Sequence, residues 1–155
     1  MKGEKPKNTF IIPFLYSDWI EDCIDSIWEY CDPKEHRIIV IDNQCDCDSS
    51  CKPTNDMYHK LKNKVHLYIH SYRNLGCAKS WNIGIQMSDT TNVTIMGDDT
   101  RLVDKDWWTK AEKYLESYEA VACGQAGKNF LSAVPEQFIR NKYTDKEWWK
   151  IRQLK

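Results

Sequence analysis

The chain has 155 residues, 29% of them charged, and a formal net charge of -1. This length fits one domain with its own core, and the balanced charge excludes a surface that gathers nucleic acid or anionic lipid over its whole extent. No stretch reaches the roughly 20 apolar residues of a membrane span, and the N-terminus lacks an apolar signal-peptide core. We therefore expect a cytoplasmic chain, with no nucleic-acid partner and no membrane span, that holds any anionic ligand in a local site.

The first part of the chain alternates apolar runs with an amphipathic segment. Residues 9–15, TFIIPFL, are apolar, β-branched or aromatic and predict a strand. Apolar side chains then recur at helical spacing over residues 17–31, with Ser17 or Asp18 as the expected N-cap. Residues 36–42, HRIIVID, form a continuous apolar run of the kind found in a strand covered on both faces.

The rest of the chain continues this alternation. After a polar loop, the pattern predicts a weak helix over about 54–62, a strand over 65–70, a helix over about 77–87, a buried strand over 92–96, a helix over about 105–117 and a short strand, AVACG, over 120–124. Strands alternating with helices indicate an α/β domain with a mainly parallel central sheet flanked by helices.

Polar or turn-forming residues stand at the ends of the first four predicted strands. They are Pro13 and Tyr16 at the end of the first, Asp42 and Asn43 at the end of the second, the stretch RNLG (73–76) after the third, and Asp98 and Asp99 at the end of the fourth. Such residues also serve ordinary turns, so each alone carries little weight. Because ligands bind at the carboxyl ends of parallel strands, we expect the four strand ends to form one binding rim.

Two adjacent carboxylates, Asp98 and Asp99, are the strongest chemical feature of this rim. The chain has neither a G-x-G-x-x-G loop after the first strand nor a G-x-x-x-x-G-K-[ST] loop, so backbone amides are not expected to be the main phosphate binders. A divalent cation held by carboxylates can instead bridge phosphate oxygens and take up charge on a departing phosphate. An isolated Asp-Asp pair is also common in turns, but together with the other strand ends this pair indicates a divalent-cation site.

Taken together, these segments resemble the nucleotide-binding part of a family-2 glycosyltransferase with the GT-A fold. The resemblance is carried by FIIPFLY (10–16), IIVIDNQCDCDSS (38–50), NLGCAKSWNIGI (74–85) and MGDDT (96–100). It implies a nucleoside-diphosphate sugar donor, usually a UDP-sugar, a Mn²⁺ or Mg²⁺ cofactor, and inverting transfer of the glycosyl group to an acceptor hydroxyl of a saccharide, lipid or protein.

The resemblance also assigns roles to individual residues. It implies that Asp42 receives the base N–H, that Asp98 contacts the ribose or sugar, and that Asp99 ligates the metal. The loop and helix start that line the donor cleft would contain Asn74, Gly76, Asn82 and Gly84. We expect Arg73 to meet diphosphate oxygens, and Lys79 to lie on a solvated helix face.

Two positions depart from the family pattern. Gly97 occupies the first place of the Asp-x-Asp motif, so metal binding depends on Asp99. Leu15 occupies the place of an aromatic residue that often stacks on the base, and Tyr16 comes one position later. Base recognition is therefore less clearly predicted than metal binding.

The catalytic base is expected in the acceptor-side tail (126–155), which follows a core of about 8–125. In the resembled family it is an Asp or Glu well downstream of the metal motif, and no Glu-Asp pair follows Asp99 here. Either the base lies in a part of a longer protein, or Asp145 or Glu147 serves. Both carboxylates open a short predicted helix, and stabilising its dipole is the alternative role.

Other functions remain open at this stage. The chain could be a nucleotide-sugar-binding module without efficient transferase activity, or a different α/β nucleotide enzyme such as a nucleotidyltransferase. The latter usually has a glycine-rich basic loop after the first strand, and PFLYSDW is not one. We expect Trp107 and Trp148 to pack at helix starts. One of the four tryptophans in the two Trp-Trp pairs could instead stack on a sugar.

Three cysteines, Cys45, Cys47 and Cys51, lie close together in a polar loop. The chain has seven cysteines and no Cys-x-x-Cys pair, which argues against a standard zinc site or a complete disulfide framework. We expect reduced loop thiols in preference to metal ligands.

Overall fold

The computed structural model describes residues 5–15, 19–43 and 55–119. Within these ranges the elements are β1 (Asn8–Phe14), α1 (Ile20–Tyr30), β2 (His36–Asp42), α2 (Asn55–Leu61), β3 (Leu67–His70), α3 (Gly76–Met87), β4 (Asn92–Ile95) and α4 (Trp107–Leu115). The chain divides into two units between Lys105 and Asp106, and α4 belongs to the second. The predicted alternation of strands and helices is confirmed.

The four described strands form one parallel sheet in the order β3-β2-β1-β4. β1 pairs with β2 from Asn8↔His36 to Phe14↔Asp42, and on its other side it pairs with β4. Because every strand runs the same way, the carboxyl ends of the strands lie at the same end of the sheet, as predicted. The strand order reverses at β1, since β2 and β3 are added on one side and β4 on the other, and ligands of open α/β sheets bind at such a switch point.

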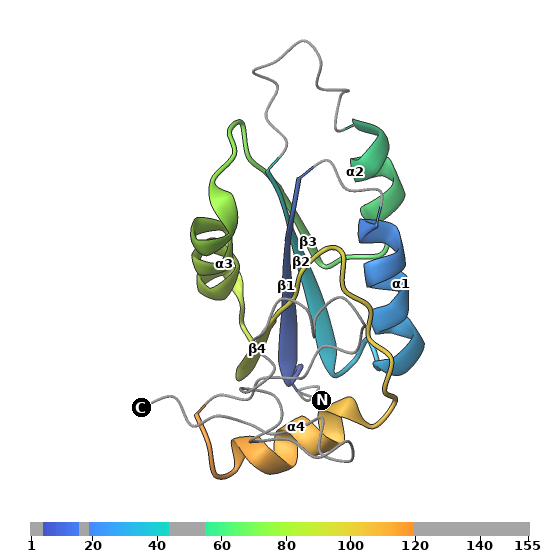
Figure 1. Cartoon of the computed structure of the whole chain (residues 1–155), viewed down its shortest axis with the longest axis vertical. Helices are drawn as coiled ribbons and strands as arrows, with labels where there is room; N and C mark the ends of the chain where they lie inside the picture. The colour runs from blue at the N-terminus through green and yellow to red at the C-terminus, as the bar shows by residue number, and fades with distance from the viewer. Residues whose placement is uncertain (1–4, 16–18, 44–54, 120–155) are drawn as a thin grey trace, which may run out of the picture. The chain divides into compact units, whose positions relative to one another are not determined.

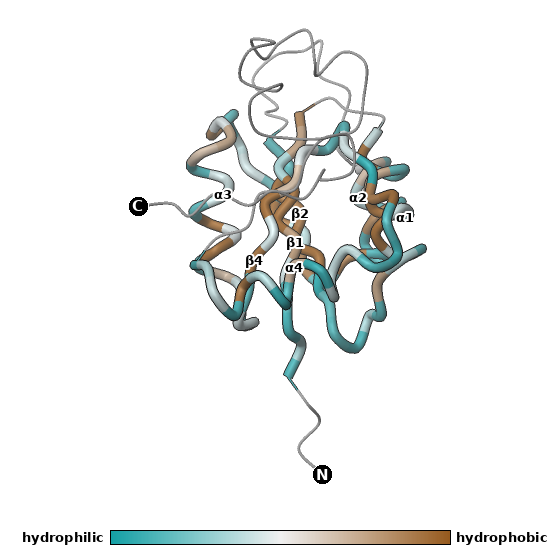
Figure 2. The backbone as a smooth tube through the Cα atoms, turned by 60° about the horizontal axis from the view of Figure 1, so that its bottom comes forward, coloured by the Kyte–Doolittle hydropathy of each residue, from teal (hydrophilic) through white to brown (hydrophobic). Residues whose placement is uncertain are grey.

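The core lies on both faces of the two central strands. Every residue of β1 is buried, and β2 is buried except at Arg37, which is half-buried. In Figure 2 these strands are the hydrophobic centre between the helices. Continuous apolar runs therefore became central strands, because a strand covered on both faces can bury residues of either parity.

Pro13 explains where the pairing of β1 and β4 ends. The carbonyl of Ile11 accepts the N–H of Met96 at 3.1 Å, so residue 11 bonds toward β4. Pro13, two residues later, is directed to the same side and has no N–H to offer. The last registered pair is Ile11↔Ile95, and beyond it the chain leaves the sheet as a loop.

Helices cover the two faces of the sheet unequally. Figure 1 shows α1 and α2 on one side of the sheet and α3 on the other. On the α3 side, Ile11, Ile39 and Ile41 form an apolar cluster with Trp81 packed against it. A Cβ on Gly84 would lie 2.3 Å from Cγ2 of Ile11, so the close approach of α3 to β1 requires a glycine there.

The prediction that residues 92–96 form a buried strand was wrong for β4. Among the described strands β4 lies at the edge of the sheet, and Val93 and Ile95 are 39% and 48% exposed. These two side chains share the face of Ile11, because they are registered with Thr9 and Ile11. The apolar composition is that of a core strand, but α3 packs on β1 and β2 instead.

The start of α1 also differs from the expectation. The helix begins at Ile20 with Trp19 in the N-cap position, and Trp19 makes no side-chain capping hydrogen bond and is 61% exposed. Ser17 and Asp18, the predicted caps, lie outside the described residues, as does the predicted strand 120–124. Trp19 therefore lies at the helix start and not on its buried face.

In the second unit the structure describes residues 106–119, which contain α4. Trp107, Trp108 and Ala111 are buried, and the two indole rings lie 5.4 Å apart in an edge-on contact. Trp107 thus packs at a helix start as expected, whereas Trp148 lies outside the described residues. In the described part of the chain, no helix has the length and apolarity needed to cross a bilayer.

Candidate functional site

Asp42, the last residue of β2, has a fully buried carboxylate held by two side chains of β3. Its Oδ2 accepts the hydroxyl of Tyr68 at 2.7 Å and lies 3.1 Å from Nδ1 of His70. Burial, with the hydrogen bond to Asp42 next in size, raises the pKa of Tyr68 well above its usual value of 10, so the hydroxyl stays a donor. Asp42 has no exposed surface. A nucleotide base could therefore reach it only if neighbouring side chains moved aside.

Asn43, the next residue, connects the end of β2 to the start of α3. Its Oδ1 accepts the backbone N–H of Leu75 at 3.2 Å, and its Nδ2 donates to Oγ of Ser80 at 2.9 Å. Successive residues of an extended backbone point to opposite faces, so Asp42 and Asn43 serve the two sides of the sheet. Asp42 thus contacts Tyr68 and His70 on one side of the sheet, and Asn43 contacts the first turn of α3 on the other.

The stretch 73–76 forms the turn that starts α3. Oδ1 of Asn74 accepts the N–H of Gly76 at 2.8 Å, and Gly76 has φ +70°, a left-handed conformation that favours glycine. Arg73 is exposed, and no ion pair of its guanidinium is recorded among the described residues. Asn82 is exposed on α3, whereas Gly84 is buried against β1, so these two predicted cleft residues lie in different environments.

The loop after β4 carries Asp98 and Asp99 and lies against α1. The thiol of Cys23 donates to the carbonyl of Gly97 at 3.5 Å, and Oγ of Ser26 accepts the N–H of Leu102 at 3.0 Å. A guanidinium–carboxylate pair between Arg101 and Asp22 joins the same two segments. One face of α1 thus holds the loop at both ends.

Both carboxylates of this loop act on the buried thiol beneath it. Burial, followed in size by the charges of Asp98 and Asp99, raises the pKa of Cys23 to about 12. The thiol therefore stays protonated and able to donate to the Gly97 carbonyl. Asp98 is half-buried and Asp99 is exposed, so the second carboxylate is the more accessible to a ligand.

Gly97 has a steric reason to be glycine. A Cβ built there would lie 2.8 Å from Oδ1 of Asp99 and 3.2 Å from Oγ1 of Thr100. The carboxylate of Asp99 thus folds back over the residue that occupies the first place of the motif. A side chain at position 97 would require Asp99 to shift.

The two loop carboxylates fit a divalent cation that is shared with a bound anion. Mg²⁺ is commonly held by one or two carboxylates together with phosphate oxygens and water. Among the described residues, no group of three or more His, Cys, Asp or Glu side chains could hold an ion. Within the described residues, Asp98 and Asp99 are thus a two-carboxylate arrangement and not a complete metal site.

The structure says less about the remaining predicted site residues. Pro13 is buried in β1 with Ile41 as its register partner, so it is part of the sheet near the carboxyl end of that strand. Leu15 is 38% exposed just beyond β1. Tyr16, Asp145 and Glu147 lie outside the described residues, as do Cys45, Cys47 and Cys51.

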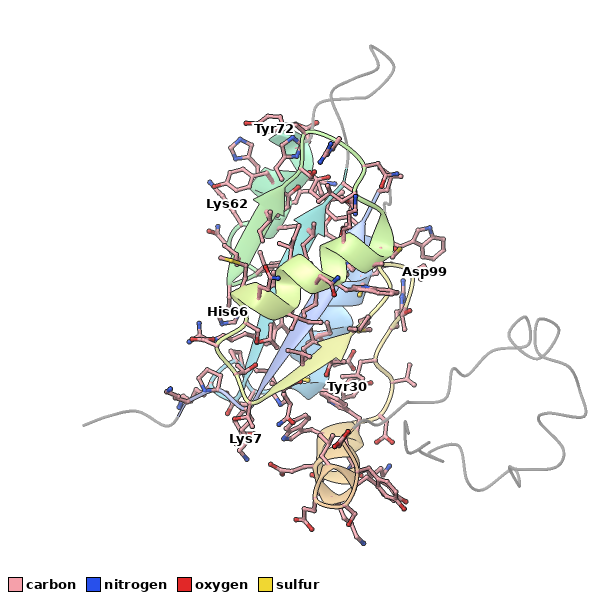
Figure 3. The ribbon with its side chains drawn as sticks, turned by 90° about the vertical axis from the view of Figure 1, so that its left-hand side faces the viewer. Lys7, Tyr30, Lys62, His66, Tyr72 and Asp99 are labelled. Atoms are coloured by element: carbon pink, nitrogen blue, oxygen red, sulfur yellow. The ribbon has the colours of Figure 1, made fainter. Side chains whose placement is uncertain are left out.

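The sheet topology brings the two acidic positions to the same edge. The ends of β2 and β4 flank β1, so they lie at least two strand spacings, or roughly 10 Å, apart across the sheet. Figure 3 shows Tyr72 and Asp99 toward the carboxyl end of the sheet and Lys7 at its opposite end. A ligand that contacts both Asp42 and the Asp98–Asp99 loop must therefore be longer than a single ion.

Sequence reasoning missed several residues that support the site. Tyr68 and His70 hold Asp42, and Cys23 and Ser26 hold the acidic loop. The alternation in LYIH places Tyr68 and His70 on one face and could have indicated the first pair. The second pair gave no such signal, because it bonds across 74 and 76 residues of sequence.

Comparisons with known proteins bear on the family and the fold of this chain. The model of the family described as "Glycosyl transferase family 2" matches residues 9–154. A structure of S. aureus TarS (residues 1–349) has a TM-score of 0.61 and 21% identity over 79% of this chain. A mannosyltransferase from Pyrobaculum calidifontis, in complex with GDP-Man and Mn²⁺, has a TM-score of 0.62 and 18% identity over 83% of this chain.

These two similarities show the shared fold, which is the GT-A glycosyltransferase fold. This chain spans 36% of the TarS structure and 38% of the mannosyltransferase. A search of curated proteins gave no match.

Proposed function

Since the chain belongs to glycosyl transferase family 2, we propose that it binds a nucleoside-diphosphate sugar and transfers the glycosyl group to an acceptor hydroxyl. The observation that carries this proposal is the pairing of a buried carboxylate at the end of β2 with two adjacent carboxylates after β4, on either side of the central strand. The carboxylate at the end of β2 suits a nucleotide base, and the two carboxylates after β4 suit a metal-bound diphosphate.

Asp42 is the proposed base-recognition residue. A carboxylate accepts N–H groups and cannot donate, so it favours a base with an N–H in the plane of the ring, as in uracil. A UDP-sugar is therefore the proposed donor. Guanine also presents N–H groups, and the mannosyltransferase with GDP-Man makes a GDP-sugar the alternative to be tested beside it.

Asp99 is the proposed metal ligand, and Asp98 the neighbour that contacts the ribose or sugar. A Mn²⁺ or Mg²⁺ ion bound there would neutralise the charge that develops on the departing diphosphate. The exposed carboxylate of Asp99 would hold the ion, while the Cys23, Ser26 and Asp22 contacts keep the loop against α1. The mannosyltransferase structure with Mn²⁺ supports the same class of cofactor.

Transfer needs a base that removes the acceptor proton as the new glycosidic bond forms. In the proposed inverting reaction the acceptor oxygen attacks the anomeric carbon from the side opposite the diphosphate, and the carboxylate takes the hydroxyl proton. Asp145 or Glu147 is the proposed base within this chain, and a carboxylate in another part of a longer protein is the alternative.

A binding module without efficient transfer is the second candidate. The two candidates share the donor site and differ only in acceptor turnover.

A thermal-stability panel tests the shared donor site. The chain is heated with UDP-sugars, GDP-sugars and ADP-sugars, each with Mn²⁺ or with chelator. A ligand at 100 times its dissociation constant adds about 2.7 kcal/mol to the free energy of unfolding. Stabilisation by one class that disappears with chelator is expected, and no stabilisation by any nucleotide sugar would overturn the proposal.

A further inference from the structure

The Asp42 carboxylate is oriented by two donors that approach the same oxygen. Tyr68 Oη lies 2.7 Å and His70 Nδ1 lies 3.1 Å from Oδ2. Register explains this convergence, because His70 pairs with Asp42, and Tyr68 pairs with Val40 two residues earlier on the same face. The Tyr68 hydroxyl donates to Oδ2, and Nδ1 of His70 donates to it in the tautomer that carries a hydrogen there.

The rings that carry these donors are themselves packed. Tyr68 lies edge-on against Phe14 at 6.4 Å and against Tyr58 of α2 at 5.4 Å. His70 is in edge-on contact with Tyr72 at 5.5 Å, and the Tyr72 side chain is 84% exposed. The two donors thus connect a buried carboxylate to aromatic side chains at the carboxyl edge of the sheet.

A carboxylate accepts hydrogen bonds at about four lone-pair positions that lie in its plane. With Oδ2 engaged by two donors, the plane of the carboxylate is fixed, and a further in-plane donor must meet a defined direction. Fixing an acceptor in this way favours a ligand N–H at one position over one at another.

We propose that Tyr68 and His70 are positioning residues that set the Asp42 carboxylate and thereby determine which nucleotide base the chain prefers. This inference rests on the proposed function, and it adds the side chains that give the base site its selectivity. The residues act through Asp42 and need no contact with the base.

Tyr68→Phe is the main test, because it removes one hydroxyl and keeps the ring contacts. Tyr58→Phe is the matched control: Tyr58 packs against Tyr68, and its hydroxyl makes no hydrogen bond among the described residues. Dissociation constants for UDP, GDP and ADP with Mn²⁺ are measured by calorimetry. We expect Tyr68→Phe to reduce the preference for the favoured base about tenfold, and Tyr58→Phe to leave it unchanged.

His70 provides a second, independent variant. His70→Ala removes the donor, whereas the amide nitrogen of His70→Asn can still donate to Asp42. Loss of base preference in the alanine variant with recovery in the asparagine variant supports positioning. If Tyr68→Phe does not fold, this pair decides the question alone.

Three results separate the inference from the proposed function. If the wild-type chain binds no nucleotide, the donor site itself is wrong. If the wild type binds and Asp42→Ala loses base preference while Tyr68→Phe and His70→Ala retain it, the positioning role is overturned and the donor site stands. A uniform loss of affinity for all three nucleotides in the variants also overturns it, because that is the effect of a structural role.

Discussion

At the scale of single residues, the position of the Asp99 carboxylate in the loop after β4 depends on Gly97. Gly97→Ala would place a Cβ 2.8 Å from Oδ1 of Asp99, and the short aspartate side chain must turn away. We expect Mn²⁺-dependent nucleotide affinity to fall about tenfold, or 1.4 kcal/mol, with little change in thermal stability. Calorimetry with UDP and Mn²⁺ measures this, and a chelator arm gives the metal-independent binding, which is expected to stay constant. Unchanged affinity would show that the observed Asp99 position is not the binding one.

The two loop carboxylates are expected to differ in their contributions. Asp99→Asn keeps the shape and removes the charge of the exposed residue, so we expect it to abolish metal-dependent nucleotide binding. Asp98→Asn changes the half-buried neighbour and is expected to weaken binding less. Titrations of each variant with Mn²⁺ and UDP compare them, and unchanged binding in Asp99→Asn would remove the metal assignment.

At the scale of elements, the packing of α3 on β1 is set by one small residue. Gly84→Ala would force a Cβ to 2.3 Å from Cγ2 of Ile11, which is fully buried. Overpacking costs about 1–3 kcal/mol, and the gain in helix propensity offsets at most about 1 kcal/mol. We expect net destabilisation in urea unfolding. The exposed Asn82→Ala on the same helix is the control, which should gain slight stability; stabilisation by both changes would contradict the close packing.

The junction of β2 and β3 is expected to make stability depend on pH. Nδ1 of His66 accepts the N–H of Ile38 at 3.1 Å, and burial, followed by the charge of Arg37, lowers the pKa of His66 below its usual value of 6.5. The unfolded chain therefore binds a proton more readily than the folded chain. The stabilisation is complete above about pH 6.5 and is lost as pH falls from there through the lowered pKa.

His66→Asn tests this pH dependence, because an amide oxygen can accept the same N–H but does not titrate. We expect the wild type to lose more melting temperature than the variant between about pH 7.5 and pH 5.5. Melting curves at several pH values measure the difference. Equal losses in both proteins would show that protonation of His66 does not contribute.

At the scale of the whole molecule, donor binding and acceptor transfer are expected to separate. The proposed donor residues lie at the carboxyl end of the sheet in the first unit, whereas Asp145 and Glu147 come after Asp106 in the sequence. If the base lies in another part of a longer protein, we expect this chain to bind donor and hydrolyse it slowly, with weak acceptor transfer, since a positioned base is worth about 10² to 10⁴ in rate. Product analysis with labelled donor separates hydrolysis from transfer. Efficient transfer that survives both Asp145→Asn and Glu147→Gln would show that the base lies elsewhere.

The alternation of strands and helices, and the common end of the sheet where the strands finish, were predictable from local sequence patterns. β2 was predicted with the bounds it has, His36–Asp42, because an apolar run covered on both faces is visible without knowledge of its neighbours. The placement of Asp42 and of Asp98 and Asp99 at one edge followed from parallel strands alone. These features depend on local composition and on one topological rule.

The residues that support this end of the sheet were not predictable in the same way, because they are brought together by long-range packing. β4 has the composition of a buried strand and lies at the edge among the described strands, because helix packing, not composition, determines which strands are covered. The hydrogen bonds of Asp42 to β3, and those of Cys23 and Ser26 to the acidic loop, join residues 26 to 76 positions apart. The alternation in LYIH shows that Tyr68 and His70 share a face, but their register beside Asp42 and the docking of α1 on the loop after β4 are not encoded by any local pattern.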